Sequence, residues 1–388
     1  MTRGNTTAST PETPVAWRLR KGRGGPKKKL STRDYFCPNA NCEYYGIRDE
    51  SIHALVGYGC HGKYEQIRDL KCQACQKKFT ARKNTVMYRL KNHSGLVEKI
   101  MGLLALGVDA SALEEVFGVR EITIRTWLCR SGTQGKIMHE RFILELELIH
   151  VQLDELWANV KSSGQDMWLW VASDVTTKIV PVMQVGGRTQ EIANRVVHEL
   201  KGRLRPSCIP VFSTDGLKNY FYALTAHFGK WELLDGKKPV WVLLSDFVYA
   251  QVIKHQRRRR TIAVEWRMLC GKEEDYRERL KAAGLSGKIN SSYVERINLT
   301  IQQSVSKLTR RTWGPAHFTP ELLEHLERWR MFYHFARYHE SLLITLDSSI
   351  ERKGKQQPQR YRRQTPAMAT GLATRRWTVK ELLSYPLL

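Results

Sequence analysis

The chain is 388 residues long and 42% hydrophobic, and its 63 Lys and Arg residues against 38 Asp and Glu residues give a net charge of +25. That much apolar material excludes wholesale disorder. The longest uncharged apolar run, residues 100–108, is far shorter than the ~20 residues that a membrane-spanning helix requires. The positive charge indicates a polyanionic partner, and nucleic acid is a better candidate than an anionic membrane surface. The alternative is that the basic surface serves only solubility.

Residues 1–33 predict a flexible basic arm. They contain nine Lys and Arg residues, one acid (Glu12) and several Gly and Pro residues, and little in them can pack. Such a segment either binds phosphate backbone loosely or stays a solvated tail. The first 14 residues are polar and lack the apolar region of a secretory signal, so we expect neither secretion nor membrane insertion.

Two cysteine pairs within residues 34–83 predict a zinc ribbon. Cys37 and Cys42 are separated by four residues, and Cys72 and Cys75 by two. Four thiolates from two such turns close the tetrahedral shell that structural Zn²⁺ prefers, and a module of this size needs a metal to fold. We therefore expect one Zn²⁺ per chain on these four cysteines.

The other cysteines are scattered. Cys60 and His61 form a rival ligand pair in the same module, while Cys129, Cys208 and Cys270 stand alone. This distribution is typical of an intracellular metal protein and not of a disulfide scaffold.

Residues 90–135 predict a helix-turn-helix unit of three short helices. Apolar residues recur at helical spacing from Leu96, a second helix covers residues 112–117, and a third covers residues 121–130. Gly118 suits the sharp turn between the last two helices. The residues that this arrangement would direct into a DNA major groove are Arg120, Thr123 and Arg125. An ordinary helical hairpin is the alternative.

Three acids far apart in the sequence are candidates for one metal site. Asp154 lies in an alternating segment expected to be a strand, Asp215 follows a second strand, and Glu295 lies on a helix that also presents Asn298. Ligands of open α/β sheets gather at the carboxyl ends of strands, and three carboxylates can hold two Mg²⁺ ions about 3.5–4 Å apart. Such ions would activate water or a sugar hydroxyl for attack on a phosphodiester.

Spacing alone does not select these three acids. Asp174 is better explained as a turn residue, Asp246 lies in a segment without a periodic pattern, and Glu155 follows Asp154 on the opposite strand face. For all of these acids, solvated or helix-capping roles are the alternative.

In their order along the chain, the motifs resemble insertion-sequence DDE transposases of the IS-one type. The resemblance covers about residues 37–385. Besides the cysteine module, it depends on Arg125-Thr126-Trp127, Asp154-Glu155-Leu156-Trp157, Thr214-Asp215-Gly216, Glu295-Arg296-Ile297-Asn298, Tyr338-His339-Glu340 and Thr365-Pro366-Ala367-Met368. Each motif alone is weak, whereas their joint presence is specific.

The resemblance implies a multidomain α/β protein with an RNase H-like catalytic core over residues 145–315 and a helical, basic C-terminal region over residues 316–388. It implies that Asp154, Asp215 and Glu295 are catalytic and bind two Mg²⁺ (or Mn²⁺) ions. The implied reaction nicks DNA at the element's terminal inverted repeats and transfers the freed 3′-hydroxyl to target DNA. The implied partners are double-stranded DNA and at least one further copy of the chain, in a prokaryotic cytoplasm at the nucleoid.

The sequence departs from compact members of this family between Asp215 and Glu295, which are 80 residues apart. An insertion over about residues 230–288 is expected to form β-hairpins and a charged helix near residues 274–280. Acids within it that rival Glu295 are Glu265, Glu273 and Glu274. Residues here and downstream that we expect at DNA, with solvated roles as the alternative, are Arg257, Arg258, Arg259, Arg260, Arg296, Asn298, Lys307, Arg310 and Arg311.

Two other functions remain open from the sequence. One is an RNase H-like nuclease that cleaves without joining, and the other is a DNA-binding regulator with zinc ribbon, helix-turn-helix and inert core. A regulator would tolerate neutralised carboxylates, and strand joining would separate a transposase from a nuclease.

Overall fold

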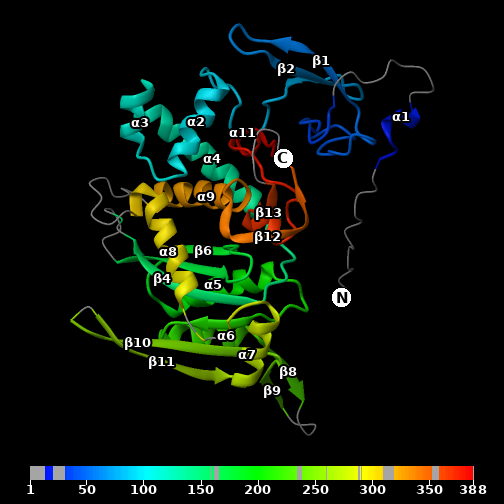
Figure 1. Ribbon diagram of the computed structural model, residues 1–388. Coiled ribbons are helices and arrows are strands. Elements are labelled where there is room, and N and C mark those ends of the chain that lie inside the picture. Colours follow the sequence, from blue (N-terminus) through cyan, green and yellow to red (C-terminus); the bar gives the residue numbers. More distant parts are fainter. Residues whose placement is uncertain are drawn as a thin grey trace, which may run out of the picture. The chain divides into compact units, whose positions relative to one another are not determined.

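A computed structural model of the chain describes residues 14–20, 31–158, 160, 166–233, 238–258, 260–286, 289, 291–308, 319–351 and 358–387. The described residues fall into two compact units (Figure 1). The first comprises the residues up to Glu98 together with the last residues from Leu383, and the second runs from Lys99 to Leu382.

The first unit contains a small antiparallel sheet and a cluster of buried cysteines. Its strands, in the order β1-β2-β3, are β1 (Leu55–His61), β2 (Ile67–Cys72) and β3 (Lys78–Thr80). Tyr44 and Leu55 are fully buried beside the cysteines. This core is small, as expected for a module whose fold depends on a metal.

Parts of the expected N-terminal arm are packed. Trp17, in α1 (Trp17–Arg20), meets the Tyr44 ring edge-on at 5.7 Å and donates a hydrogen bond from Nε1 to Gln73 at 2.8 Å. Thr32 is fully buried. The prediction of an unpacked arm is wrong for these residues, because a single large aromatic side chain gains enough from burial to order its neighbours. Residues 1–13 and 21–30 lie outside the described residues.

Three helices follow, as the sequence predicts. They are α2 (Ser94–Leu104), which crosses from the first unit into the second, α3 (Ala110–Phe117) and α4 (Glu121–Phe142). The Asp109 carboxylate caps α3 by accepting the N–H of Ser111 at 3.3 Å, and Gly118 ends it with a φ of 64°. Only glycine adopts this backbone conformation without strain, so the sharp turn falls where expected.

The third helix is much longer than the expected 121–130. Its second half packs on α9 (Thr319–Phe335), which the sequence predicted as a helix. Gly132 and Gly135 allow the approach: a Cβ built on Gly132 would lie 2.5 Å from the carbonyl oxygen of Glu324. Glycine is a poor helix former, so the local sequence does not predict the second half of α4 as a helix. Packing on α9 stabilises it.

A six-stranded mixed sheet forms the centre of the second unit (Figure 1). Its strands, in the order β11-β10-β7-β4-β5-β6, are β4 (His150–Ala158), β5 (Met167–Asp174), β6 (Val182–Gly186), β7 (Val211–Thr214), β10 (Val248–Arg257) and β11 (Arg260–Cys270). β4, β5 and β6 are antiparallel neighbours, β7 runs parallel to β4, and β10 runs parallel to β7.

Helices cover both faces of this sheet. On one face, Leu169 and Val171 of β5 share a buried cluster with α8 (Ser292–Ser304) and α9. On the other, Trp170 meets the ring of Tyr220 at 5.3 Å. The helices on that second side are α5 (Gln190–Arg203) and α6 (Lys218–His227). Along the chain, three strands and a helix are followed by a fourth strand and another helix.

The expected insertion forms hairpins and a charged helix, as predicted. They are the pair β8 (Gly229–Leu233) and β9 (Pro239–Leu243), the pair β10 and β11, and α7 (Glu273–Ala282). However, β10 belongs to the main sheet, since it pairs in parallel with β7. The free end of the β10–β11 hairpin reaches beyond the rest of the sheet (Figure 1).

The C-terminal region is not wholly helical, which corrects the sequence prediction. After the short 3₁₀ turn η1 (Ser306–Leu308) and α9, the strands β12 (His339–Ile350) and β13 (Gln359–Gln364) pair antiparallel. The β-branched and serine-rich stretch of β12 favours a strand over a helix. Two short helices follow, α10 (Pro366–Ala369) and α11 (Val379–Ser384).

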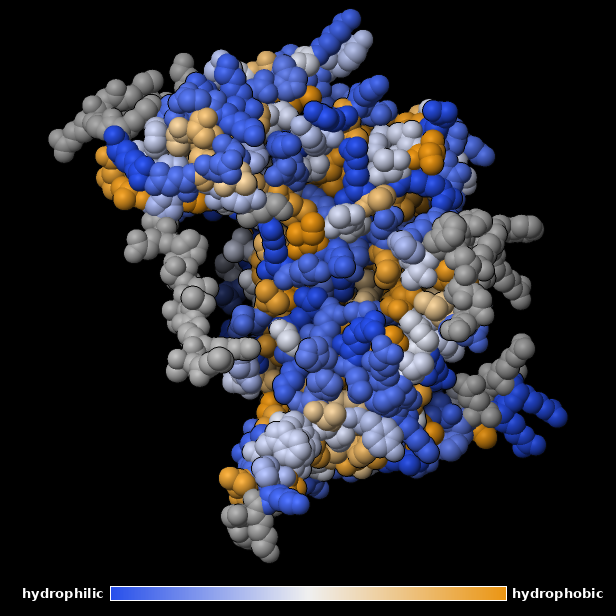
Figure 2. Space-filling model, turned by 180° about the vertical axis from the view of Figure 1, so that it is seen from behind, coloured by the Kyte–Doolittle hydropathy of each residue, from blue (hydrophilic) through white to orange (hydrophobic). Residues whose placement is uncertain are grey.

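Hydrophobic residues on the face shown in Figure 2 form small separate groups among hydrophilic side chains. Within the described ranges, no helix combines the length and apolar character needed to cross a membrane, as the short apolar runs predict.

Candidate functional site

Four cysteines of the first unit form a compact sulfur cluster. The Sγ atoms of Cys37, Cys42, Cys72 and Cys75 all lie within 4.8 Å of one another. Those of Cys37 and Cys75 are 3.6 Å apart and those of Cys42 and Cys72 are 3.8 Å apart, with all four cysteines free. A tetrahedral ion with Zn–S bonds of ≈ 2.3 Å separates its sulfurs by about 3.8 Å. These cysteines could therefore hold a metal such as Zn²⁺.

A neighbouring cysteine and the local backbone favour the ionised form of one thiol in the cluster. A hydrogen bond from Cys37, together with the N–H groups of Cys75 and Ala74, lowers the pKa of Cys72 to about 5 despite burial. Burial, with the charge of Cys72 and a hydrogen bond with Cys75, instead raises the pKa of Cys42 to about 11. The thiolate is the form that binds metals, so the cluster presents a ligand that is ionised at neutral pH.

The rival pair Cys60 and His61 does not join this cluster, so that alternative is wrong. Both residues are exposed on β1, and His61 Nδ1 lies 2.9 Å from the carboxylate of Asp69. They lie on the exposed part of β1, and neither belongs to the group of four clustered thiols.

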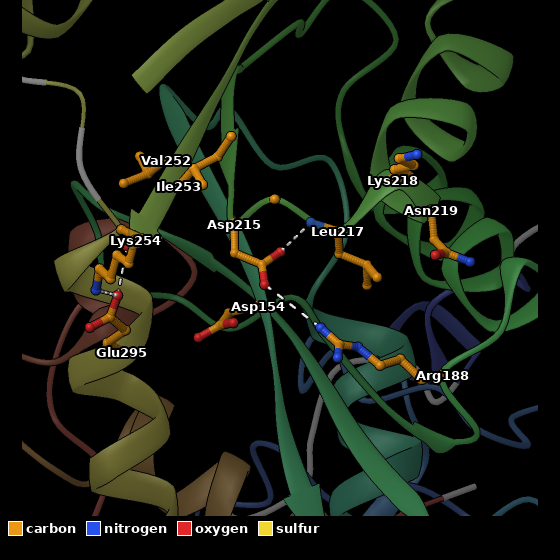
Figure 3. A pocket seen from close by; sticks show the side chains of 12 residues that line it. Asp154, Arg188, Asp215, Leu217, Lys218, Asn219, Val252, Ile253, Lys254 and Glu295 are labelled. Carbon is orange, nitrogen blue, oxygen red and sulfur yellow. Dashed lines mark hydrogen bonds and ion pairs between the residues drawn. The ribbon is translucent and has the colours of Figure 1, made fainter. Parts of the chain in front are cut away.

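The second candidate site begins where β7 ends beside the middle of β4. Leu153 pairs with Thr214 in the parallel register, so the next residues, Asp154 and Asp215, project together at the carboxyl edge of the sheet. They line a pocket of about 740 Å³ (Figure 3). This edge is where ligands bind in open α/β sheets.

A third carboxylate, from Glu155, lies with these two. Oxygens of Asp154, Glu155 and Asp215 are within 4.8 Å of one another. Glu155 does face the opposite side of β4, where the Tyr220 hydroxyl donates to its Oε2 at 3.0 Å. Facing the opposite side of the strand therefore does not separate Glu155 from the aspartates, because one of its oxygens still lies within 4.8 Å of theirs.

Glu295 approaches from α8 and lines the same pocket, outside the tight group of three (Figure 3). Its Oε1 accepts a hydrogen bond from Ser291 Oγ at 2.6 Å and forms an ion pair with Lys254. Asn298, one turn further along α8, donates from Nδ2 to Asp154 Oδ2 at 2.9 Å. The shared helix face expected for Glu295 and Asn298 thus points toward Asp154.

The clustered carboxylates give the pocket a negative charge that favours binding of a cation. Burial, with the charges of Asp215 and Glu155, raises the pKa of Asp154 to about 7. Burial is also the main cause that raises the pKa of Asp215 and of Glu155. An added divalent cation would relieve both the repulsion and the desolvation, and carboxylate oxygens are the ligands that Mg²⁺ prefers.

The competing acids have other roles. The buried Asp174 carboxylate accepts backbone N–H groups of His150 and Thr177 at 3.1 and 2.7 Å, so its expected role in a turn is confirmed. Asp246 is exposed and does not line the pocket. Of the acids in the expected insertion, Glu265 pairs with His255 and Glu273 with Arg277, at 3.2 and 2.5 Å. None of the insertion's rival glutamates lines the pocket.

The residues expected at a DNA groove lie at the start of α4. Arg120 is exposed immediately before the helix, and Thr123 is half-buried. Arg125 Nη2 lies 2.6 Å from Glu121, and Nη1 pairs with Glu321. Arg125 is therefore already engaged within the protein, because α9 brings an acid against this helix.

The other basic residues separate into exposed and buried positions. Arg257 and Arg258 are exposed at the free end of the β10–β11 hairpin, and Arg296 is exposed on α8. Lys307 is only 7% exposed with Nζ 3.5 Å from Glu321, so its expected place in a surface cluster is wrong. Arg259, Arg310 and Arg311, and the side chain of Arg260, lie outside the described residues.

Two basic side chains of the pocket were not among the residues predicted from the sequence. Arg188 lies between β6 and α5, and its Nη2 pairs with Glu155 and lies 3.8 Å from Asp215 Oδ2. Lys254 reaches Glu295 from β10. Neither residue belongs to a recognisable motif, and only the tertiary fold brings them to the acids.

No protein-family model matches the chain, and a comparison with the curated proteins finds no match. Its function is therefore inferred from the residues and geometry of the two sites.

Proposed function

We propose that the chain is a DNA transposase that cleaves DNA and transfers strands with the help of divalent metal ions. The observation that carries the proposal is the meeting of Asp154, Asp215 and Glu295 in one pocket of a strongly basic protein. The motif resemblance to DDE transposases of the IS-one type names the same three residues.

The strand order supports an RNase H-like core. Three antiparallel strands, β4 to β6, are followed by β7 and β10, which add in parallel on the other side of β4. Asp154 lies on the first of these strands, Asp215 directly follows the fourth, and Glu295 lies on a later helix. This placement supports the RNase H-like core that the resemblance implies.

In this proposal Asp154, Asp215 and Glu295 hold two Mg²⁺ ions. Bound Mg²⁺ would lower the pKa of an attacking water or 3′-hydroxyl and stabilise the leaving oxygen. The parallel register keeps the two aspartates side by side, and the hydrogen bond from Asn298 orients Asp154. Glu295 must exchange its ion pair with Lys254 for the metal.

The first unit and the helix-turn-helix would recognise the DNA ends. All four sulfurs of the cluster would be used by one Zn²⁺, which leaves no open position and so favours a structural ion. Arg120 and Thr123 are placed at the amino end of α4, where a recognition helix reads bases. Because two ends must be cut and joined together, we expect a dimer or a larger assembly.

The test uses the full chain, a labelled fragment of the DNA that flanks its reading frame, a target plasmid and Mg²⁺. We expect joined products, and we expect Asp154→Ala, Asp215→Ala and Glu295→Gln to abolish them while binding persists. Asp246→Ala, an exposed acid outside the pocket, is the matched control.

Each alternative has its own outcome in this assay. Cleavage without joining would identify a nuclease instead. Binding alone, unchanged by Asp154→Ala, would identify a regulator and refute the enzymatic proposal.

A further inference from the structure

Arg188 is held at the mouth of the carboxylate pocket from three directions. Its Nη2 forms an ion pair with Glu155 Oε1 and lies 3.8 Å from Asp215 Oδ2. The centre of its guanidinium lies 4.9 Å from the centroid of the Trp168 ring. A long, flexible side chain is rarely fixed in this way on a surface, because ordering it costs rotamer entropy.

The partners of Arg188 are themselves rigid. The Glu155 side chain is 1% exposed and its second oxygen accepts the hydroxyl of the fully buried Tyr220. Trp168 lies in the sheet opposite Gly186, two residues before Arg188. The guanidinium is therefore preorganised by a buried carboxylate and by a ring that the sheet positions.

This arrangement leaves part of the guanidinium unused. In both of its ion pairs the nearest atom is Nη2, no hydrogen bond from Nε or Nη1 is found among the described residues, and the side chain is 42% exposed. Guanidinium carries five N–H donors in a fixed fork, so Nε and Nη1 remain available to a planar or tetrahedral anion.

The remaining N–H donors of Arg188 lie in a pocket whose centre is formed by the acidic residues Asp154 and Asp215. Figure 3 shows Arg188, Lys218 and Asn219 on one side of Asp154 and Asp215, with Glu295 and Lys254 on the other. A phosphodiester that approached the aspartates would need a cation to offset its own charge. Arg188 lies where it can offset that charge without leaving Glu155.

We propose that Arg188 is a phosphate-binding side chain of this pocket, and that Glu155 acts as a positioning residue that holds it toward a non-bridging oxygen of the nucleic-acid backbone. The proposal rests on the proposed phosphoryl transfer and deepens it by assigning the substrate's backbone to the Arg188 side of the pocket. Arginine forms charge-assisted, bidentate hydrogen bonds with phosphate, and these strengthen as charge develops in the transition state.

The test measures two quantities for each variant of the full chain. The first is the rate of nicking, with MnCl₂, of a supercoiled plasmid that carries the DNA flanking the reading frame. The second is Mn²⁺ affinity, from the electron paramagnetic resonance signal of free Mn²⁺. Arg188→Gln should lower the nicking rate by ~100-fold and leave Mn²⁺ affinity unchanged or tighter, because a cation has left the carboxylates.

Two further variants separate the proposed roles. Arg188→Lys keeps the charge but loses the fork, so it should recover part of the rate. Glu155→Gln keeps a hydrogen-bond partner for Tyr220, and it should lower nicking without weakening Mn²⁺ binding. Arg195→Gln, which removes an exposed arginine paired with Glu191 on α5, is the matched control and should nick like the wild type.

Two results would overturn the inference. One is wild-type nicking by Arg188→Gln, which would make Arg188 a mere counter-charge to the acids. The other is loss of Mn²⁺ affinity in Glu155→Gln as large as in Asp154→Ala, which would make Glu155 a metal ligand. If Asp154→Ala itself nicks like the wild type, the proposed function fails first and the inference fails with it.

Discussion

Asp154 and Asp215 are neighbours across two parallel strands, each directly following the register pair of Leu153 with Thr214. Their carboxylates cannot separate without breaking that register, because the backbones of β4 and β7 are hydrogen-bonded up to this point. Like charges held this close in a partly buried pocket cost stability until a cation binds. If the site binds a divalent cation as proposed, the protein without the cation should bear this cost, and the cost can be measured as a loss of stability.

Neutralising Asp154 should stabilise the protein in magnesium-free buffer. The pKa of Asp154 is raised to about 7 from its ordinary 3.8, mainly by burial. The unfolded chain therefore loses this proton first, so stability falls as the pH rises from about 4 through 7. We expect Asp154→Asn to increase the free energy of unfolding at pH 8 by about 2 kcal/mol and to have little effect below pH 4. Urea unfolding followed by tryptophan fluorescence measures this difference.

Asp246→Asn is the control for that series, because this carboxylate is exposed and lies outside the pocket. It should leave the stability unchanged at both pH values. An Asp154→Asn variant that is less stable than the wild type at pH 8 would contradict the electrostatic account.

Binding of Mg²⁺ should offset the loss of stability that the repulsion between the carboxylates causes. Adding Mg²⁺ should raise the unfolding temperature of the wild type, because a ligand that binds only the folded state stabilises it by mass action. The shift should be largely absent in Asp215→Ala, which lacks one of the two adjoining carboxylates. Equal shifts in both proteins, measured by calorimetry, would place the ion elsewhere.

Replacing one buried cysteine should remove zinc from the first unit. Cys72→Ser loses the ligand whose pKa is already lowered to about 5, so the cluster keeps only three sulfurs. We expect elemental analysis to find one firmly held zinc ion per wild-type chain and none in this variant, with unfolding of the first unit. Cys60→Ser is the control, since Cys60 is exposed, and a loss of zinc there would show that the ligand set is different.

The contact between α4 and α9 should not tolerate a side chain at Gly132. An added Cβ would lie 2.5 Å from the carbonyl oxygen of Glu324, and backbone cannot move aside cheaply. Gly132→Ala should lower the free energy of unfolding by about 1–3 kcal/mol, although alanine is the better helix former. Gly202→Ala, where nothing lies within 4 Å, should be neutral or mildly stabilising in the same measurement. Similar effects at both positions would refute close packing.

The free end of the β10–β11 hairpin should contribute to DNA affinity through charge alone. Replacing Arg257 and Arg258 by Ala should weaken binding to all duplexes alike and reduce the slope of log affinity against log salt by about 2. Arg205→Ala, which removes an exposed arginine paired with Glu147, tests whether any lost charge has this effect. A double variant with an unchanged salt slope in fluorescence anisotropy would exclude contact of these arginines with phosphate.

Several features could be predicted from the sequence because they depend on local spacing. The two cysteine pairs, the turn at Gly118, and the placement of Asp154 on a strand and of Asp215 after one all follow from short stretches of chain. The hairpins and charged helix between Asp215 and Glu295 were also predictable, since turn residues and alternation mark them. The length of α4 was predicted wrongly, because its second half contains Gly132 and Gly135, which are poor helix formers, and is stabilised by packing on α9, far away in the sequence.

By itself, then, the sequence determined the thiol ligand set, the turn at Gly118, and the placement of Asp154 on a strand and of Asp215 after one, because each of these is encoded in residues close together in the chain. Only the tertiary structure decided that Glu155 joins the two aspartates, that Arg188 and Lys254 supply cations to the acids, and that Lys307 is buried against Glu321. Those outcomes depend on contacts between segments far apart in the sequence, whose burial and mutual charge exist only once the sheet and its covering helices have assembled.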